Sequence, residues 1–269
     1  MMGGEYGPEV TVKGLNYAFK KLENVHANLF GNEKKIRDVL NKYPYLSDKV
    51  SIFHTDNFVP MDAKPTDAVR RIGKDSSMWM SIESCKNRKS DVVLSAGNTG
   101  ALMALSKLIL KTVDGIERPA ITALWPNTEG DSVVLDLGAN IDVSSNQLVQ
   151  FGIMGYSYAV CVLKKSHPKI AILNIGHEEF KGSNELQEAF ERLSVIFKDK
   201  FIGFVEGDDL SKGTADVIIT DGFTGNVALK TAEGIAKLIG FYLSDSLKSN
   251  ISGKLGMFIA QNSLKSFKK

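Results

Sequence analysis

Short runs of apolar, often β-branched residues recur along the whole chain, and most of them end in, or are followed by, glycine or a polar residue. They lie at residues 27–31, 50–54, 91–95, 121–125, 133–137, 170–174, 201–205 and 216–220. Runs of this length and composition predict buried β-strands. Several are separated by helical patterns, as in residues 184–197, where Asn184 with Gln187 resembles a capping box. Alternating strands and helices predict an α/β fold with a mostly parallel sheet and flanking helices.

Length and charge favour an ordinary globular protein. A chain of 269 residues buries a large core without disulfides or metals. Its 33 Lys and Arg nearly balance its 31 Asp and Glu, so the charge gives no argument for nucleic acid as a partner. Cys85 and Cys161 lack metal-binding or CxxC spacing, and we expect buried, reduced thiols. We expect neither a membrane span nor a signal peptide, and therefore a cytoplasmic protein.

The segment 95–100, Ser-Ala-Gly-Asn-Thr-Gly, joins the expected strand 91–95 to an expected helix over 101–111. Glycines permit a tight turn with bare backbone N–H groups, and Asn98 or Thr99 is suited to cap the helix. The positive end of the helix then faces an anion such as phosphate. Glycine at such a turn also serves geometry alone, and for a single loop the two interpretations are about equally good.

The same pattern recurs after four other expected strands. Asp, Asn or Glu stands beside glycine in LDLGAN (135–140), LNIGHEEFKG (173–182), VEG (205–207) and TDGFTGN (220–226). Polar groups are costly to bury unless they are paired or used. We therefore expect five polar strand ends to converge on one crevice at the carboxyl edge of one sheet.

The chain has no GxSxG, HExxH or GxxxxGK[ST] motif, which argues against a nucleophilic serine, a zincin or a P-loop mechanism. Among the histidines, only His177 lies in a candidate loop. Lys181 is the cation best placed to reach the crevice, although a solvated loop lysine explains it as well. Arg118 either binds an anion or ends the sheet, and Lys230 faces either the ligand or solvent.

The helix expected after Ser144 carries Gly152, Gly155 and Ala159 at near-helical spacing. Small residues on one stripe let another backbone approach closely. Tight packing inside one subunit and a dimer interface both account for this stripe, and the sequence leaves both open.

Taken in order, these motifs resemble the PlsX-type phosphate acyltransferases of bacterial phospholipid synthesis. The resemblance covers nearly the whole chain, and this collinearity is more specific than any single glycine loop. It rests on MGGE (2–5) with Pro8, DSSM (75–78), SAGNTGALMA (95–104), RP (118–119), LDLGAN (135–140), QF (150–151), MG (154–155), LNIG (173–176), KG (181–182), VEG (205–207) and DGFTGN (221–226).

The resemblance implies transfer of a long-chain fatty acyl group from acyl carrier protein to orthophosphate. The product, acyl phosphate, then serves a downstream glycerol-3-phosphate acyltransferase. No metal or organic cofactor is implied. It also implies a homodimer and a fold similar to the isocitrate and isopropylmalate dehydrogenases and to phosphotransacetylase, with two lobes around a cleft. A phosphotransacetylase-like acyl-CoA enzyme and a non-catalytic membrane-associated scaffold are the competing functions.

Each candidate residue has an expected role. We expect the helix start at Asn98 to bind phosphate, and the other polar groups to orient the thioester and stabilise the oxyanion. Asp136 and Asp221 are expected to orient these donors. The expected catalytic residues are Asn98, Asn140, Asn174, Lys181 and Asn226, and the expected substrate-binding residues are Gly97, Thr99, Gly100, Arg118, Asp136, Gly138, Glu178, Glu206, Asp221 and Lys230.

We expect residues 1–269 to form a single α/β catalytic unit that lacks the first strand and the C-terminal segment usual in the family. Within it, residues 236–269 read as a basic amphipathic helical segment, because residues 246–269 hold five lysines and no acid. Two interpretations of this segment stay open: peripheral contact with an anionic membrane, and an ordinary helical hairpin with a solvated lysine face.

Overall fold

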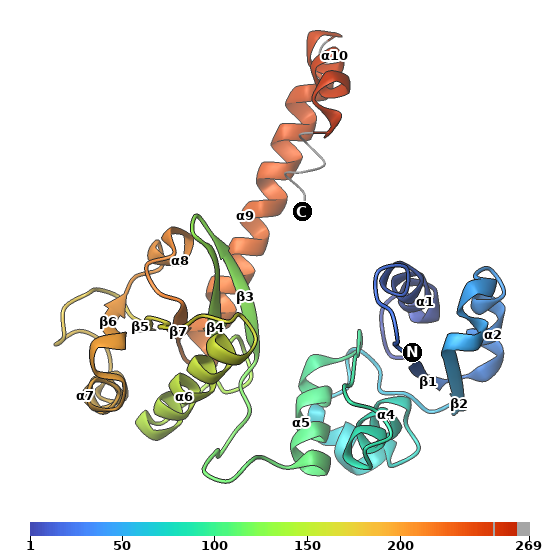
Figure 1. The fold of residues 1–269 in the computed structure, drawn as a ribbon, viewed down its shortest axis with the longest axis horizontal. Coiled ribbons are helices and arrows are strands. Elements are labelled where there is room, and N and C mark those ends of the chain that lie inside the picture. Colours follow the sequence, from blue (N-terminus) through green and yellow to red (C-terminus); the bar gives the residue numbers. More distant parts are fainter. Residues whose placement is uncertain (250, 263–269) are drawn as a thin grey trace. The chain divides into compact units, whose positions relative to one another are not determined.

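A computed structural model describes residues 1–249 and 251–262 of the chain. The chain divides into two compact units, Met1–Pro119 and Ala120–Lys269. Each unit has its own sheet and its own buried apolar clusters, and Figure 1 labels their elements.

The first unit contains a two-stranded parallel sheet in which Ala27 pairs with Val50. One apolar cluster, including Val12, Ile36 and Leu46, packs around this sheet, and a second gathers around the helices that follow it. The elements are α1 (Gly7–Ala18), β1 (Ala27–Gly31), α2 (Glu33–Leu40), a 3-10 turn (Pro44–Lys49), β2 (Val50–His54), α3 (Pro65–Asp67), a π-helical turn (Ala68–Ile72), α4 (Ser77–Lys86) and α5 (Thr99–Leu110).

The strand expected at residues 91–95 is absent, and this prediction was wrong. The segment pairs with neither sheet, and its Val92 and Leu94 side chains are 68% and 84% exposed. The two residues that precede segment 91–95 do contact β1. The Asn28 side chain of β1 donates to Lys89 O at 3.1 Å and to Ser90 Oγ at 3.0 Å. A β-propensity run without a backbone partner does not form a strand. The expected helix after it is confirmed as α5.

The second unit is a five-stranded sheet in the order β3-β4-β7-β5-β6. Strands β4, β7, β5 and β6 are parallel, as predicted, whereas β3 runs antiparallel to β4. The elements are β3 (Thr122–Asn127), β4 (Gly130–Leu135), α6 (Ser145–Cys161), β5 (Ile170–Leu173), α7 (Asn184–Phe197), a 3-10 turn (Lys198–Lys200), β6 (Phe201–Val205), α8 (Asp209–Lys212), β7 (Val217–Ile219), α9 (Gly222–Lys248) and α10 (Ile251–Ile259).

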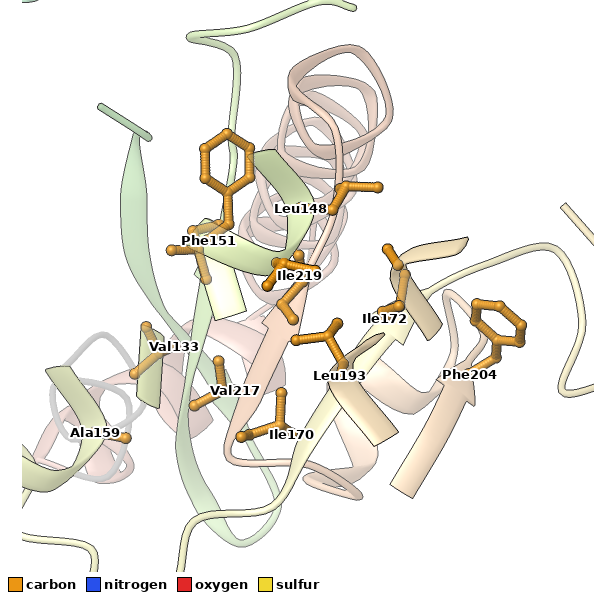
Figure 2. Packing of buried hydrophobic residues seen from close by; sticks show 13 residues of the cluster. Val133, Leu148, Phe151, Ala159, Ile170, Ile172, Leu193, Phe204, Val217 and Ile219 are labelled. Carbon is orange, nitrogen blue, oxygen red and sulfur yellow. The ribbon is translucent and has the colours of Figure 1, made fainter. Parts of the chain in front are cut away.

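Helices cover both faces of this sheet. On one face, Leu148 and Phe151 of α6 and Leu193 of α7 pack against Val217 and Ile219 of the central strand, and Figure 2 shows this cluster. The other face packs against α8 and the first turns of α9, with Leu210, Ala228 and Leu229 in its cluster. Strands buried on both faces explain the near-continuous apolar runs in the sequence.

Small residues on α6 serve packing inside the unit. A Cβ atom on Gly152 would lie 2.8 Å from Leu193 Cδ2, and one on Gly155 would lie 2.5 Å from Val217 Cγ1. Both glycines therefore let α6 lie close to α7 and the sheet, so the small residues of this stripe serve packing inside the unit.

The capping boxes also differ from expectation. Ser144 and Gln147 form one at the start of α6, while α7 is capped by Ser183 rather than by Asn184.

Both cysteines are free thiols, but the prediction that they are buried was wrong, because Cys85 is only partly buried and Cys161 is exposed. Within residues 1–249 and 251–262, no helix combines the length and apolar character needed to cross a membrane.

Candidate active site

The carboxyl ends of four parallel strands bring four polar loops to one edge of the sheet in the second unit. In the order of the strands, these loops are residues 136–140 after β4, 220–226 after β7, 174–182 after β5 and 206–209 after β6. Ligands of open α/β sheets bind at this edge. The expectation that five strand ends lie on one sheet was wrong, because segment 95–100 belongs to the first unit and follows no strand.

The loop 136–140 is built around the fully buried carboxylate of Asp136. One of its oxygens accepts the backbone N–H groups of Ile121, Gly138 and Ala139, at 2.9 to 3.2 Å. The other accepts the Asn140 backbone N–H at 2.7 Å and the Asn140 side-chain amide at 2.8 Å. A carboxylate with this many donors is well compensated for its burial. Asp136 therefore fixes the backbone of the loop and the orientation of Asn140.

The first turn of α9 lies directly on that loop. Asp221 caps the helix, its carboxylate accepting Thr224 N at 2.8 Å and Thr224 Oγ1 at 2.7 Å. The Gly222 N–H donates to Asn140 O at 2.8 Å. A Cβ atom on Gly225 would collide with the Asp136 carbonyl oxygen. Only glycine permits this approach, and it brings the start of α9 against both Asp136 and Asn140.

Two more candidate residues meet at the same place. Gly138 has φ +130°, a conformation that favours glycine. A Cβ atom at this position would lie 3.4 Å from the Asn226 Cβ atom. Asn226 itself is exposed. The structure thus gathers five predicted residues at this part of the edge: Asp136, Gly138, Asn140, Asp221 and Asn226.

The loop 174–182 is closed on itself by Asn174. Its side-chain amide donates to Lys181 O at 3.0 Å, and its Oδ1 atom is buried without a hydrogen-bond partner among the described residues. The Lys181 ammonium lies 2.7 Å from the Glu178 carboxylate. The hydrogen bond from Lys181 holds the pKa of Glu178 below its usual value. A Cβ atom on Gly176 would lie 2.5 Å from Lys181 Cδ, so glycine gives the lysine its room.

The loop 206–209 is the neighbour of 174–182. Asp209 is nearly buried and accepts the Glu206 N–H at 2.9 Å. Burial alone raises the pKa of Asp209, but the Glu206 N–H and the Lys212 ammonium together lower it below the usual value. The Glu206 carboxylate lies 3.7 Å from His177 Nε2. The sequence singled out Glu206 and His177, but not Asp209.

In the first unit, Asn98 joins two loops. Its Oδ1 accepts the Ala101 N–H at 2.9 Å, which caps α5 as predicted. Its amide donates to Met61 O and to Ala63 O, each at 2.8 Å. The side chain therefore shapes the start of α5 and holds the loop around Met61 to it.

The glycines beside Asn98 allow three segments to meet. A Cβ atom on Gly4 would lie 2.9 Å from Ala96 O, and one on Gly97 would lie 3.3 Å from Met78 Cε and 3.5 Å from the Gly3 carbonyl carbon. A Cβ atom on Gly100 would lie 3.1 Å from Pro65 Cγ. The N–H groups of Thr99 and Gly100 open the helix without an intrahelical partner, as first-turn groups do. These N–H groups are suited to an anion.

The two other predicted cations are both exposed. Lys230 is exposed on α9 and pairs with Glu233 at 3.0 Å. Arg118 is exposed next to the end of the first unit. Over the described part of the chain, His, Cys, Asp and Glu side chains form no group of three or more suited to a metal ion.

The whole chain, residues 1–269, matches the family described as "Fatty acid synthesis protein". This chain belongs to that family. The phosphate acyltransferase of Parvibaculum lavamentivorans is 44% identical to this chain over 269 residues, which are 100% of this chain and 74% of the relative. The phosphate acyltransferase of Rhodospirillum rubrum is 47% identical over 268 residues, 99% of this chain and 76% of the relative. The resemblance seen in the sequence is thereby confirmed.

Solved structures share the fold of this family member. A phosphotransacetylase from Streptococcus pyogenes superposes with a TM-score of 0.61 at 17% identity, covering 86% of this chain and 79% of the other. The EutD phosphotransacetylase from Staphylococcus aureus gives a TM-score of 0.59 at 16% identity, covering 86% and 80%. The α/β fold with a parallel sheet and the likeness to phosphotransacetylase are confirmed, while the likeness to the dehydrogenases stays a prediction.

Proposed function

We propose that this protein transfers a long-chain fatty acyl group from acyl carrier protein to orthophosphate, giving acyl phosphate for lipid synthesis. The observation that carries the proposal is the extent of the likeness to phosphate acyltransferases, 44% identity over 269 residues and 47% over 268. The family description as a fatty acid synthesis protein supports the lipid context. The carrier protein as acyl donor is the part of the proposal that most needs a direct test.

The reaction needs positioning and charge stabilisation more than a protein nucleophile. A phosphate oxygen attacks the thioester carbonyl carbon, a C–O bond forms, and the carbonyl oxygen becomes an oxyanion. The oxyanion then collapses, the C–S bond breaks, and the carrier thiolate leaves and takes a proton from water. Dianionic phosphate already supplies the attacking oxygen, so the protein supplies donors that hold both reactants.

We assign the phosphate to the start of α5. The N–H groups of Thr99 and Gly100 and the positive end of the helix favour an anion there. The hydrogen bonds of Asn98 to Ala101, Met61 and Ala63 support a role in shaping this loop. Gly97 leaves the backbone room for close approach.

We assign the thioester and its oxyanion to the sheet edge of the second unit. Asn140, Asn226 and Lys181 are the donors proposed there, and Asn174 contributes by holding the Lys181 backbone at 3.0 Å. Asp136 and Asp221 act through their neighbours, since both carboxylates accept hydrogen bonds that build the loops. Glu178 and Glu206 border the same edge.

The assay of choice uses radiolabelled orthophosphate with the purified 269-residue chain. One arm supplies a long-chain acyl carrier protein, a second the matching acyl-CoA and a third acetyl-CoA. We expect labelled acyl phosphate chiefly from the carrier-bound donor. Product chiefly from acetyl-CoA would support a phosphotransacetylase-like enzyme instead. A folded chain that makes no product from any donor would support the non-catalytic scaffold.

We further propose a cytoplasmic homodimer that contacts the inner face of the membrane peripherally, beside the acyltransferase that consumes acyl phosphate. The supporting feature is the apolar surface of the last two helices. Half or more of each side chain is exposed in Ile235, Leu238, Ile239 and Tyr242 of α9, and in Leu255, Phe258 and Ile259 of α10. Of the five lysines in residues 246–269, three lie in residues 263–269, outside the described residues.

Vesicle co-sedimentation tests the membrane contact. We expect anionic vesicles to retain the unsubstituted 269-residue chain and to lose it on the Phe258→Glu, Ile259→Glu double substitution. Val195→Glu is the matched control, because Val195 is 75% exposed on α7 of the same unit. Equal retention of all three proteins would favour the solvated hairpin. Light scattering after size exclusion measures whether the chain is a dimer.

A further inference from the structure

His177 connects two neighbouring loops of the candidate site. It belongs to loop 174–182, which also carries Lys181, and its ring reaches the adjacent strand β6 and the loop after it. Nδ1 lies 3.1 Å from Phe204 O, while Nε2 lies 3.5 Å from Asp209 Oδ2 and 3.7 Å from Glu206 Oε1. The role proposed above for loop 174–182 involves Asn174 and Lys181 and not the His177 ring.

The partners of the ring fix where its protons lie. A carbonyl oxygen only accepts hydrogen bonds, so the Phe204 contact requires a proton on Nδ1. In the neutral ring, Nε2 then presents a lone pair to the carboxylates of Asp209 and Glu206. In the cationic ring, Nε2 carries a proton that both carboxylates attract. The contact with loop 206–209 is therefore attractive only when the ring is charged.

Loop 206–209, which faces the His177 ring, is held in place by its own contacts. Asp209 is 5% exposed and accepts the Glu206 N–H at 2.9 Å. Lys212 lies 3.1 Å from Asp209 and 2.6 Å from Asp208, so one ammonium partly offsets three acids. On the loop of His177 itself, Glu178 is paired with Lys181 at 2.7 Å. A positive ring at His177 adds a second cation to this acidic group and so reduces its excess of negative charge.

The loop transmits this contact to Lys181. Asn174 binds the Lys181 carbonyl oxygen at 3.0 Å, and the Lys181 N–H donates to Glu178 O at 3.0 Å. Residues 174–181 thus form a closed loop. It meets β6 at the Asn174 N–H, which donates to Val205 O at 2.8 Å, and at the His177 ring. A loop fixed at both of these points holds the Lys181 ammonium at the sheet edge.

We propose that His177 is a positioning residue which, as a cation, holds loop 174–182 and its Lys181 against loop 206–209, and which as a neutral ring weakens that hold. The consequence for catalysis rests on the role proposed above for Lys181. The hold itself rests only on the contacts of the ring.

The charge environment favours the cation near neutral pH. The hydrogen bond to Phe204 O and then, against partial desolvation, the charges of Asp209, Glu206 and Asp208 raise the pKa of His177 above its usual value of about 6.5. A raised pKa means that the contribution is fully present below about pH 6.5. It is lost as the pH rises through the higher value of the folded protein.

Two measurements on the whole 269-residue chain test directly whether His177 holds the loop. Side-chain NMR should show the Nδ1-protonated tautomer for neutral His177, and its titration should shift to lower pH in Glu206→Gln. Hydrogen exchange, corrected for intrinsic rates, should show residues 174–182 less protected at pH 8.5 than at pH 6. In His177→Asn, whose amide can still donate to Phe204 O but carries no charge, protection should no longer depend on pH. His167→Asn, an exposed histidine of the same unit, should behave as wild type.

The kinetic arm measures KM and kcat for orthophosphate across the same pH range. We expect kcat/KM of wild type to fall about two- to five-fold as His177 loses its proton, as for one partly exposed ion pair, and the fall to be absent in His177→Asn. If hydrogen exchange changes as expected but kcat/KM does not, His177 still holds loop 174–182, and the catalytic role proposed for Lys181 is wrong. Equal protection in wild type and His177→Asn at both pH values, or an Nε2-protonated neutral ring, would overturn the proposal.

Discussion

The Asp136 carboxylate holds Asn140 through one oxygen, which accepts the side-chain amide at 2.8 Å and the backbone N–H at 2.7 Å. The first turn of α9 then lies on this pair, through the Gly222 N–H to Asn140 O at 2.8 Å. A donor proposed for the oxyanion is thus positioned by a buried acid that is itself fully engaged. Positioning of this kind lets a site stabilise charge without rearranging when the charge develops.

Asp136→Asn is expected to destabilise the second unit. The amide keeps one accepting oxygen but turns its N–H groups toward N–H donors of the loop, so at least two buried donors lose their acceptor. The free energy of unfolding should fall by about 2–3 kcal/mol, measured by urea denaturation. Asp142→Asn is the control, because Asp142 is exposed in the same segment. An equal effect of the two substitutions would contradict the role given to Asp136.

Gly225→Ala and Gly234→Ala should have opposite effects within one helix. A Cβ atom on Gly225 meets the Asp136 carbonyl oxygen, whereas nothing lies within 4 Å of one on Gly234. Overpacking should lower stability by about 1–3 kcal/mol at the first position. At the second, relief of glycine's entropy cost should raise it by about 0.5–1 kcal/mol. Thermal unfolding of both variants decides, and a stabilised Gly225→Ala would disprove the close approach.

Asn98→Asp tests whether the side chain shapes the phosphate loop. Aspartate still caps α5, but it places a carboxylate against the carbonyl oxygens of Met61 and Ala63. Losing both donors should cost about 1–3 kcal/mol in stability and raise KM for orthophosphate. Asn87→Asp, at the exposed end of α4, should change neither. If Asn98→Asp is destabilised but its KM for orthophosphate is unaltered, Asn98 stabilises the loop without contributing to phosphate binding.

Most of the sheet was predictable because β5 and β7 are fully buried and β4 is buried over most of its length. Runs such as 170–174 and 201–205 are mostly apolar for the length of a strand and include β-branched residues. Segment 91–95 has the same composition, yet sequence does not say whether a neighbouring backbone is available to pair with it. The β3–β4 hairpin did carry a signal, since Asn127-Thr128-Glu129-Gly130 is a turn and Pro126 is suited to an edge strand.

The candidate residues were found by type, but their contacts needed the fold. Glycine beside Asp or Asn at a strand end is visible in sequence, and it gathers Asp136, Asn140 and Asp221 correctly at one edge. The link from His177 to Asp209 depends on β6 lying next to β5 and on the direction of one ring. Neither follows from spacing along the chain.

Lys181→Met should lower kcat without unfolding the protein. Removing one charged donor from a transition-state site costs about 100-fold in kcat or more, while the exposed pair with Glu178 at 2.7 Å adds little to stability. Lys165→Met is the control. It breaks the pair with Asp216 at 2.9 Å before β7, at the opposite edge of the sheet, and should keep kcat.

Glu178 gives an independent readout, because the hydrogen bond from Lys181 lowers its pKa. In wild type the ion pair is therefore present above the usual glutamate pKa of about 4.3 and is lost as the pH falls through the lower folded value. Carboxyl NMR titration of Lys181→Met should show the Glu178 pKa moved upward. A normal kcat together with this upward shift would leave Lys181 as a partner of Glu178 alone and assign the oxyanion to the asparagines.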